Sequence, residues 1–188
     1  MQAFSILEPI SDQLTLVDDR LEEFSNTSDL PSLKELLTHV FESTGKLARP
    51  ALTLLTAGFH PNDGEKVVTM ATAVEMLHVA TLIHDDTVDE ADTRRGRVTV
   101  SSNWGQHTAV LLGDYVFAAS ATYVCATGNI RVIKRFSETI MDLSRGQMQE
   151  TANSRNIEHG LEEYLERIYF KTASLFSTSG ESGAILSG

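Results

Sequence analysis

The sequence has 188 residues, a formal net charge of −11 and 41% hydrophobic residues. That length allows one ordinary domain with a core, and the acidic balance argues against a general nucleic-acid binder, which would carry a basic face. Any anionic ligand must therefore be held by a local basic cluster or by metal ions. The single cysteine, Cys125, excludes an internal disulfide and fits a reducing cytoplasm, and we expect it to be a small, buried apolar residue.

Most of the sequence follows a helical period, and strand signals are scarce. Residues 10–24 predict a surface helix, because acids lie opposite an apolar face formed by Ile10, Leu14, Val17, Leu21 and Phe24. Capping residues and a first-turn proline predict a helix within 26–41, and a short apolar helix follows at 50–59. Further helices are expected at about 101–127, 129–152 and 158–179.

The longest predicted helix, 64–89, is apolar on nearly every side and should lie at the centre of the fold. Its apolar positions are Val67, Met70, Ala71, Val74, Leu77, Ala80 and Leu82. We therefore predict an all-α, antiparallel helix bundle that forms a single domain over residues 1–188. The N-terminus lacks the pattern of a signal peptide, and the uncharged runs are rich in polar residues, so we expect no membrane span.

The central helix ends in "HDDTVDE", where buried carboxylates would be costly without partners. Asp85 and Asp89 are four residues apart, so on a helix they share one face at a separation of about 6 Å. A divalent cation such as Mg²⁺ would relieve their repulsion and leave coordination positions for a phosphate. Asp86 and Asp92 fall on other faces and look secondary. A solvated acidic helix end is the alternative, whereas an EF-hand is excluded because its glycine and glutamate positions are exchanged.

Basic residues lie at three places that a diphosphate could bridge. Arg94 and Arg95 follow the acids, and we expect Gly96 to end the helix there. The segment "TGKLARP" places Lys46 and Arg49 three residues apart, so they can converge if the segment is helical.

The third basic set is "YFKTAS", where Lys171 precedes Thr172. Each set alone is weak, since a lysine on a helix is usually solvated, but guanidinium and ammonium groups beside paired carboxylates suit diphosphate oxygens. Together they indicate two anionic pockets, one bridged by metal and one purely basic. His78 lies two turns before Asp85 on roughly the same face, as a core histidine by default or as a donor to a diphosphate.

These segments resemble those of the trans-isoprenyl diphosphate synthases, also called polyprenyl synthetases, from about residue 40 onward. "GKLARP" is similar to the GKxxRP segment of that family, and "EMLHVATLIHDDTVDEADTRRG" to the helix that carries its first aspartate-rich motif, DDxxD, followed by RRG. "LLGDYVFAASA" and "YFKTASLF" also fall where the family has similar segments. The resemblance implies the isoprenoid synthase fold and a Mg²⁺-dependent prenyltransferase that joins isopentenyl diphosphate to an allylic diphosphate such as farnesyl diphosphate.

The resemblance also implies a role for each matching residue. Mg²⁺ on the allylic diphosphate would be bound by Asp85 and Asp89. The same diphosphate would be held by Arg94, Lys171 and Thr172, and the catalytic set would be Asp85, Asp89, Arg94 and Lys171. Isopentenyl diphosphate would be held by Lys46, Arg49, His78 and Arg95. The segment "GQMQE" departs from the family's GExxQ, so Gln147 and Glu150 are left out of the predicted site.

Small residues one turn before Asp85 predict a long product. In this family an aromatic residue there closes the hydrophobic tunnel early, whereas this sequence has Thr81 with Ala80 beside it. The tunnel should then stay open to about Leu77, which predicts a product longer than farnesyl and geranylgeranyl diphosphates.

The family carries a second aspartate-rich motif on a later helix, and this sequence does not contain one. Three interpretations stay open: a synthase without its C-terminal helices, one part of a split enzyme, or a non-catalytic subunit of a heteromeric synthase. A terpene cyclase shares DDxxD but needs no metal-free diphosphate pocket, and Lys46, Arg49 and Arg95 argue against it. The resemblance further implies a homodimer, or a heteromer with a related subunit, in the cytoplasm.

Overall fold

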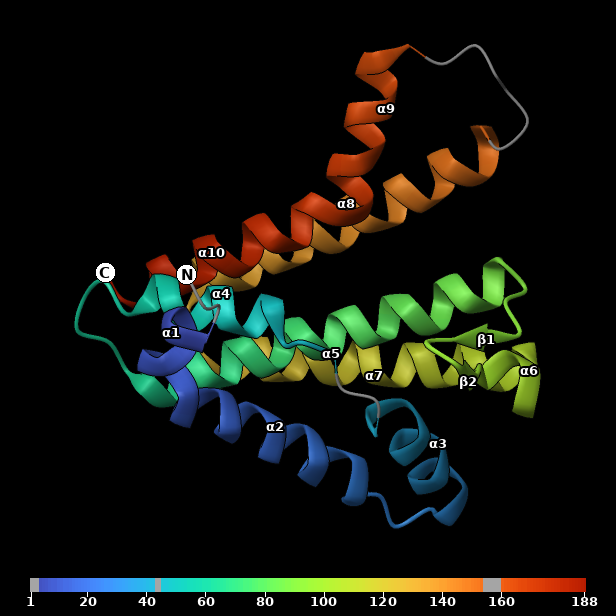
Figure 1. The fold of residues 1–188 in the computed structure, drawn as a ribbon, viewed down its shortest axis with the longest axis horizontal. Coiled ribbons are helices and arrows are strands. Elements are labelled where there is room, and N and C mark those ends of the chain that lie inside the picture. Colours follow the sequence, from blue (N-terminus) through green and yellow to red (C-terminus); the bar gives the residue numbers. More distant parts are fainter. Residues whose placement is uncertain (1–3, 43–44, 154–159) are drawn as a thin grey trace.

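The computed structural model describes residues 4–42, 45–153 and 160–188, and nearly all of them are helical (Figure 1). The elements in chain order are α1 (Phe4–Leu7), the 3₁₀ turn η1 (Glu8–Ile10), α2 (Ser11–Asn26), α3 (Pro31–Phe41), α4 (Ala48–Ala57), α5 (Gly64–Val88), β1 (Thr93–Arg94), β2 (Arg97–Val98), α6 (Val100–Trp104), α7 (Gln106–Ala126), α8 (Ile130–Asn153), α9 (Leu161–Ile168), the π-helical turn η2 (Tyr169–Ala173) and α10 (Ser174–Leu186). The prediction of an all-α bundle is confirmed.

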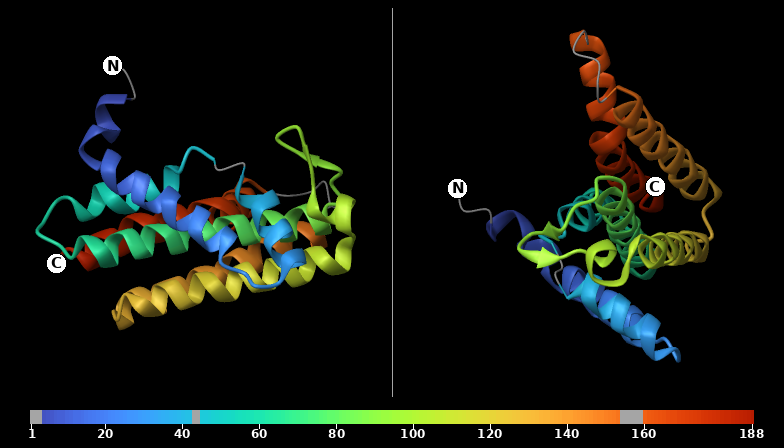
Figure 2. Two further views of the ribbon diagram at one scale, coloured as in Figure 1. Left: turned by 90° about the horizontal axis from the view of Figure 1, so that it is seen from below. Right: turned by 90° about the vertical axis from the view of Figure 1, so that its right-hand side faces the viewer.

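The long helix α5 lies at the centre, antiparallel to α7 beside it (Figure 1). Its side chains are buried without interruption over residues 67–77, as its all-round apolar sequence predicts. Asp63 caps its start by accepting from the backbone N–H groups of Glu65 and Lys66. α2 packs on one side of α5, whereas α4 packs on it from another side with α10 against α4 (Figure 2).

Two clusters of buried side chains hold the bundle together. The larger joins α2 through α5 with α6 and α7, and the smaller joins α5 and α7 to α8 and α10 around Phe136 and Leu175. The predicted apolar face of 10–24 is confirmed, because Ile10, Val17 and Leu21 are buried in the larger cluster. Burial of large aliphatic and aromatic side chains contributes about 1.5–3 kcal/mol each, so this core holds α5 in place within the bundle.

Two sequence-based predictions about the centre of the chain are wrong. α5 ends at Val88, so Arg94 and Arg95 do not continue the helix but lie in an antiparallel hairpin that pairs β1 with β2. Arg95 and Gly96 form its turn with φ of 52° and 80°, the pattern of a two-residue hairpin turn with both central residues left-handed. Cys125 is exposed rather than buried, because it lies on the outward face of α7, which no described element covers.

The last predicted helix is longer than expected. It begins at Leu161, passes through η2 and continues to Leu186, where the sequence predicted an end near residue 179. α8 and α9 rise away from the rest of the bundle in Figure 1, and α10 brings the chain back against α4.

Two helices, α5 and α7, are long and apolar enough to cross a membrane by length and composition alone. For α5 the buried core explains that composition, because 72% of its most apolar window is buried. For α7 only 33% is buried, and Val110, Leu111 and Tyr115 are exposed on its outward face. Both observations are weak evidence for a span, since core helices of water-soluble proteins pass the same test.

Candidate functional site

The carboxylates at the end of α5 lie in three different environments. Asp85 is half-buried, Asp86 is buried, and Asp89 is the exposed C-cap residue, whose N–H donates to the Asp85 carbonyl at 2.8 Å. Burial raises the pKa of Asp85, the Lys171 ammonium opposes that rise, and the Asp89 charge adds to it. Asp85 and Asp89 therefore repel each other beside two basic side chains, Lys171 and Arg94, as the spacing of the carboxylates predicts.

The donor set at this end of α5 fits a magnesium ion that keeps most of its waters. Within the described ranges, no three or more His, Cys, Asp and Glu side chains converge as a metal cluster. Asp85 and Asp89 thus offer two carboxylates, the number that Mg²⁺ uses when phosphates and waters complete its shell. A cation between them would also offset the charge repulsion that raises the Asp85 pKa.

An apolar cavity of about 290 Å³ opens beside Asp85. From α5 it is lined by His84 and by Leu77, Thr81 and Asp85, which follow each other at intervals of four residues on one face. The other apolar walls come from α7 and α8, through Phe117, Ile140, Leu143 and Met148. Two of the predicted chain-length positions, Leu77 and Thr81, therefore line the cavity, whereas Ala80 is buried outside this lining.

Close packing of α5 against α7 supports this cavity near Asp85. A Cβ added at Gly113 of α7 would overlap the His84 imidazole, so glycine leaves the space that the ring fills. His84 Nε2 also lies 3.3 Å from Asp114 Oδ1. The segment "LLGDY" thus sets how closely the two helices approach beside the carboxylates.

Lys171 reaches this site from the π-helical turn η2 and forms an ion pair with Glu150 of α8. Single π-helical turns inside helices are frequent at functional sites. A Cβ at Gly146 would lie 2.9 Å from the Lys171 backbone nitrogen, so glycine allows α8 to approach η2 here. Thr172 is exposed and does not line the cavity, so its predicted contact with a diphosphate stays a prediction.

Two residues that the sequence analysis left out belong to this site. Gln147 lines the cavity, and the Glu150 charge acts on both Asp85 and Lys171. Their spacing of three residues on α8 puts them on one face, and this spacing was the sequence feature that could have indicated that both belong to the site. The altered order of residue types in "GQMQE" hid it.

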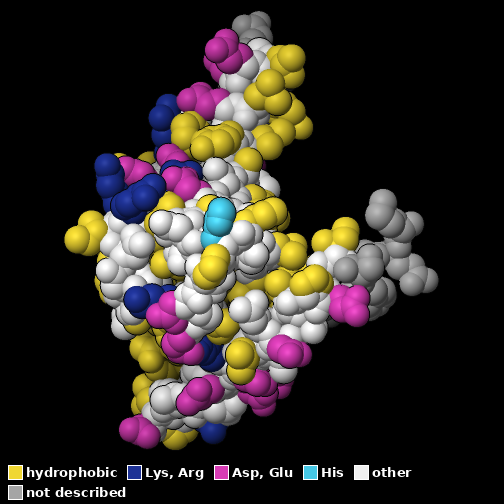
Figure 3. Space-filling view, turned by 90° about the vertical axis from the view of Figure 1, so that its left-hand side faces the viewer, with side chains coloured by type: hydrophobic (Ala, Val, Ile, Leu, Met, Phe, Trp, Pro, Cys, Tyr) yellow, Lys and Arg dark blue, Asp and Glu magenta, His cyan; other side chains and the backbone are white. Residues whose placement is uncertain are grey.

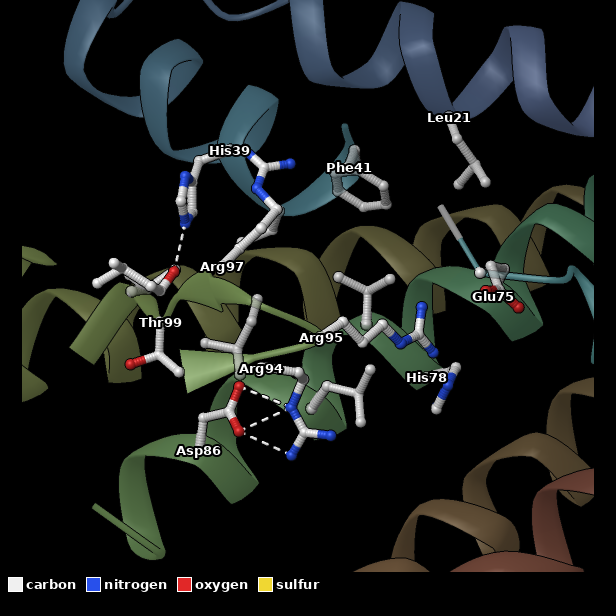
Figure 4. A pocket seen from close by; sticks show the side chains of 17 residues that line it. Leu21, His39, Phe41, Glu75, His78, Asp86, Arg94, Arg95, Arg97 and Thr99 are labelled. Atoms are coloured by element: carbon white, nitrogen blue, oxygen red, sulfur yellow. Dashed lines mark hydrogen bonds and ion pairs between the residues drawn. The ribbon is translucent and has the colours of Figure 1, made fainter. Parts of the chain in front are cut away.

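Next to Asp85 on α5, Asp86 fixes the position of Arg94, whose charge also acts on Asp85 (Figure 4). The Arg94 Nε donates to both Asp86 oxygens at 2.7 and 2.8 Å, and its Nη2 lies 2.7 Å from Oδ1. Burial raises the Asp86 pKa, and the hydrogen bond and charge of Arg94 oppose that rise. Asp86 is thus a partner of an arginine rather than a free carboxylate, and Arg94 keeps further N–H groups for a ligand.

The hairpin that carries Arg94 and Arg95 is tied to α3 and α6. His39 Nε2 donates to the Val98 carbonyl at 2.9 Å, and its ring meets that of Trp104 edge-on with centroids 4.9 Å apart. Arg97 Nη2 donates to Glu42 Oε2 at 2.8 Å. These contacts hold Arg94 and Arg95, the two arginines at the tip of the hairpin, over the end of α5.

A second, smaller cavity of about 90 Å³ lies behind this hairpin and is lined by two members of the other basic set, His78 and Arg95. Arg95 extends from the hairpin toward His78 and Glu75 on α5 (Figure 4). It also packs against Gly45, where an added Cβ would lie 3.1 Å from its Nη1. Burial lowers the His78 pKa to about 3, helped by the charges of three arginines, so the imidazole is neutral at pH 7.

Arg49 joins this basic set from α4. Its guanidinium lies 4.4 Å from the centre of the Phe176 ring, and its buried Nε has no hydrogen-bond partner among the described residues. Its pKa is lowered by burial, raised by Glu75 and lowered by Arg95. Lys46 is exposed and precedes α4, which begins at Ala48, so the helix does not bring it beside Arg49.

The geometry can accommodate two anions at once. One anion would be bound by Lys171 and by a cation held by Asp85 and Asp89, beside the larger cavity. The other would be bound by the arginines near the smaller cavity and by the neutral His78. Elsewhere, the end of the molecule seen in Figure 3 mixes acidic, basic and hydrophobic side chains and presents no single basic face.

Comparison with known proteins gives consistent matches along the chain. The polyprenyl synthetase family model matches residues 30–188. A prenyl transferase of Synechocystis sp. is 39% identical over 97% of this chain and 57% of its own length. A heptaprenyl diphosphate synthase component 2 of Geobacillus stearothermophilus is 36% identical over 95% of this chain and 56% of its own length.

Among solved structures, a polyprenyl synthase from Caulobacter crescentus, complexed with calcium and isoprenyl diphosphate, superimposes with a TM-score of 0.91. It is 30% identical, and the match covers 97% of this chain and 56% of that one. The chain thus spans somewhat more than half the length of these relatives.

Proposed function

The chain belongs to the polyprenyl synthetase family, and from that premise we propose that it condenses isopentenyl diphosphate with an allylic diphosphate, such as farnesyl diphosphate, to make a longer all-trans polyprenyl diphosphate. One observation carries the proposal above the others. Asp85 and Lys171 line an apolar cavity of about 290 Å³, and the Asp89 carboxylate acts on Asp85 beside it. A diphosphate head and a prenyl chain need that combination of charge and apolar space.

In this proposal Asp85 and Asp89 hold Mg²⁺, which would neutralise charge on the leaving diphosphate. Lys171 and Arg94 donate to oxygens of the same group, with Thr172 as a further predicted contact. A unit charge pair 4 Å apart is worth about 1 kcal/mol in water but about 4 kcal/mol at an effective dielectric near 20. A closed, half-buried site therefore favours separation of diphosphate from the allylic carbon far more than water does.

The second substrate occupies the basic set behind the hairpin. Arg49 and Arg95 donate to its diphosphate, Lys46 contributes charge, and the neutral His78 donates a hydrogen bond without adding a cation. The isopentenyl double bond then attacks the allylic cation, a carbon–carbon bond forms, and a proton leaves the isopentenyl unit, with the released diphosphate as the nearest base. No protein nucleophile is required.

The length of the product follows from the floor of the larger cavity. Thr81 lies one turn below Asp85, and Leu77 lies one turn below Thr81 on the same face. Because Thr81 is small, we propose that the prenyl chain passes it, giving a product longer than geranylgeranyl diphosphate. The printed name of one relative, a heptaprenyl diphosphate synthase component, is in keeping with this proposal.

We also propose a homodimer, or a heteromer with a related subunit, in the cytoplasm. The exposed apolar residues Val110, Leu111 and Tyr115 on α7 suit a subunit contact better than water. The relative named as component 2 of a heptaprenyl diphosphate synthase supports the heteromeric form. In that form the chain would be a half-site or non-catalytic subunit, which is the second candidate function.

A prenyltransfer assay with labelled isopentenyl diphosphate, farnesyl diphosphate and Mg²⁺ tests the proposal, with products sized by chain length. Turnover that requires both substrates supports the synthase. Cyclised product from the allylic substrate alone would establish a terpene cyclase instead. Mg²⁺-dependent binding of the allylic diphosphate without turnover, restored by a related subunit, would establish the half-site form. If neither diphosphate binds, the synthase, the terpene cyclase and the half-site form are all refuted.

A further inference from the structure

Glu75 is a buried carboxylate that the proposed mechanism does not use. Only 5% of it is exposed, and it lies in the stretch of α5 that is otherwise apolar or small. His78 follows it by three residues, and both line the smaller cavity behind the hairpin (Figure 4). A carboxylate in such a place is costly unless charges or hydrogen bonds compensate for its burial.

The compensating charges on Glu75 come from the two arginines of the basic set. Burial raises its pKa, and Arg49 and then Arg95 oppose that rise. Burial and the Arg95 charge lower the Arg49 pKa, and the Glu75 charge opposes that lowering. Glu75 therefore offsets the repulsion between two guanidiniums: Arg95 lines the same cavity from the hairpin, and Arg49 acts on Glu75 from α4.

Asp86 supplies a precedent on the same side of α5. It is 7% exposed, lines the same cavity and holds Arg94 through both carboxylate oxygens. The eleven positions from Glu75 to Asp86 equal about three helical turns, so the two residues share one face. α5 thus presents carboxylates to its arginines on this face, while Asp85 lines the larger cavity.

We propose that Glu75 is a positioning residue that holds the guanidiniums of Arg49 and Arg95 in place to receive the diphosphate of isopentenyl diphosphate. This role rests on the proposed function and extends it to a residue that touches no substrate. Glu75 keeps the two cations together before the anion arrives, which reduces the cost of assembling the pocket on binding.

Whether Glu75→Gln weakens or tightens the binding of isopentenyl diphosphate distinguishes a positioning role of Glu75 from direct repulsion of the ligand by its charge. An isopentenyl diphosphate anion near Glu75 is repelled by the carboxylate, so removal of that charge alone would tighten binding. If Glu75 positions the arginines, the isosteric change Glu75→Gln weakens binding instead, because the guanidiniums lose the opposite charge that keeps them together at the cavity.

Isothermal titration of the 188-residue chain with isopentenyl diphosphate, without metal, measures this effect. We expect Glu75→Gln to weaken binding by about tenfold or more, a change of about 1.4 kcal/mol per tenfold. Titration of the same variant with farnesyl diphosphate and Mg²⁺ should give an affinity within about twofold of wild type, since that site lies on the other face of α5. The matched control is Glu65→Gln, the same change on the same helix at an exposed residue paired with Arg20.

Each outcome bears on the proposal. Equal or tighter isopentenyl diphosphate binding by Glu75→Gln would overturn the role of Glu75 while leaving the proposed function intact. An equal loss at both substrates would show a general structural role and would also overturn it. Absence of isopentenyl diphosphate binding by the wild-type chain would remove the proposed function itself. If Glu75→Gln does not fold, Glu75→Asp keeps the charge but retracts it, and we expect the same selective loss at a smaller size.

Discussion

The neutral imidazole of His78 makes folding stability depend on pH in a way that one substitution removes. Burial and the nearby arginines lower its pKa from 6.5 to about 3. Between these two values the unfolded chain binds a proton at His78 that the folded chain does not. Protons therefore favour the unfolded chain in this range, so His78 lowers stability as the pH falls below about 6.5. The substitution His78→Gln keeps a hydrogen-bonding side chain but removes the titration.

The size of the effect follows from the same two pKa values. Each pH unit below the unfolded pKa costs about 1.4 kcal/mol until the folded pKa is reached. At pH 5 the loss attributable to His78 is therefore about 2 kcal/mol, whereas at pH 7.5 it is close to zero. Between pH 7.5 and pH 5, wild type should therefore lose about 2 kcal/mol more of its free energy of unfolding than His78→Gln does.

Urea unfolding followed by far-ultraviolet circular dichroism at pH 7.5 and pH 5 measures this difference. The difference between the two proteins is the quantity of interest, because all other titrating groups affect both alike. Val79→Ala is the matched control, since Val79 lines the same cavity and carries no titratable group, and it should keep the wild-type pH dependence. An identical pH dependence in wild type and His78→Gln would refute the argument that His78 is buried neutral among arginines.

Three further predictions concern the larger cavity, the helix packing and the metal site. Thr81→Phe should shorten the prenyl product sized by chromatography, because the ring fills the cavity one turn below the carboxylates; an unchanged product length would contradict this. Gly183→Ala should lower the free energy of unfolding in urea by about 1–3 kcal/mol, because its Cβ would overlap the Thr53 carbonyl oxygen, whereas Gly180→Ala makes only ordinary contacts and should cost nothing measurable. Asp85→Asn should weaken Mg²⁺-dependent binding of farnesyl diphosphate at least tenfold (about 1.4 kcal/mol) in calorimetry, with metal-free isopentenyl diphosphate binding retained.

The features that the sequence predicts well are those that depend on one helix at a time. The burial of α5 follows from its all-round apolar composition, and the placement of Leu77, Thr81 and Asp85 along one cavity wall follows from their spacing. Periodicity determines which residues share a face, so these properties are local. The family resemblance adds the roles of those residues but not their geometry.

The features that the sequence does not predict depend on contacts between elements. The hairpin at Arg94 has strands of two residues, too short for an alternating pattern, and its turn has arginine at a left-handed position where asparagine or glycine is usual. The ion pair of Glu150 with Lys171 and the electrostatic interaction of Glu75 with Arg49 join residues far apart in the chain. Cys125 is exposed because no described element covers that face of α7, which composition alone cannot indicate.

The edge-on contact between His39 and Trp104 gives the molecule an internal optical reporter. The sequence has one tryptophan, so all indole emission comes from α6, directly after the hairpin that carries Arg94 and Arg95. His39 also donates to the hairpin itself, at the Val98 carbonyl, so any shift of the hairpin on diphosphate binding alters the surroundings of the indole. The proposed binding of a diphosphate at the basic pocket, where it moves the hairpin, is therefore expected to change the protein's own fluorescence, without a label and without turnover.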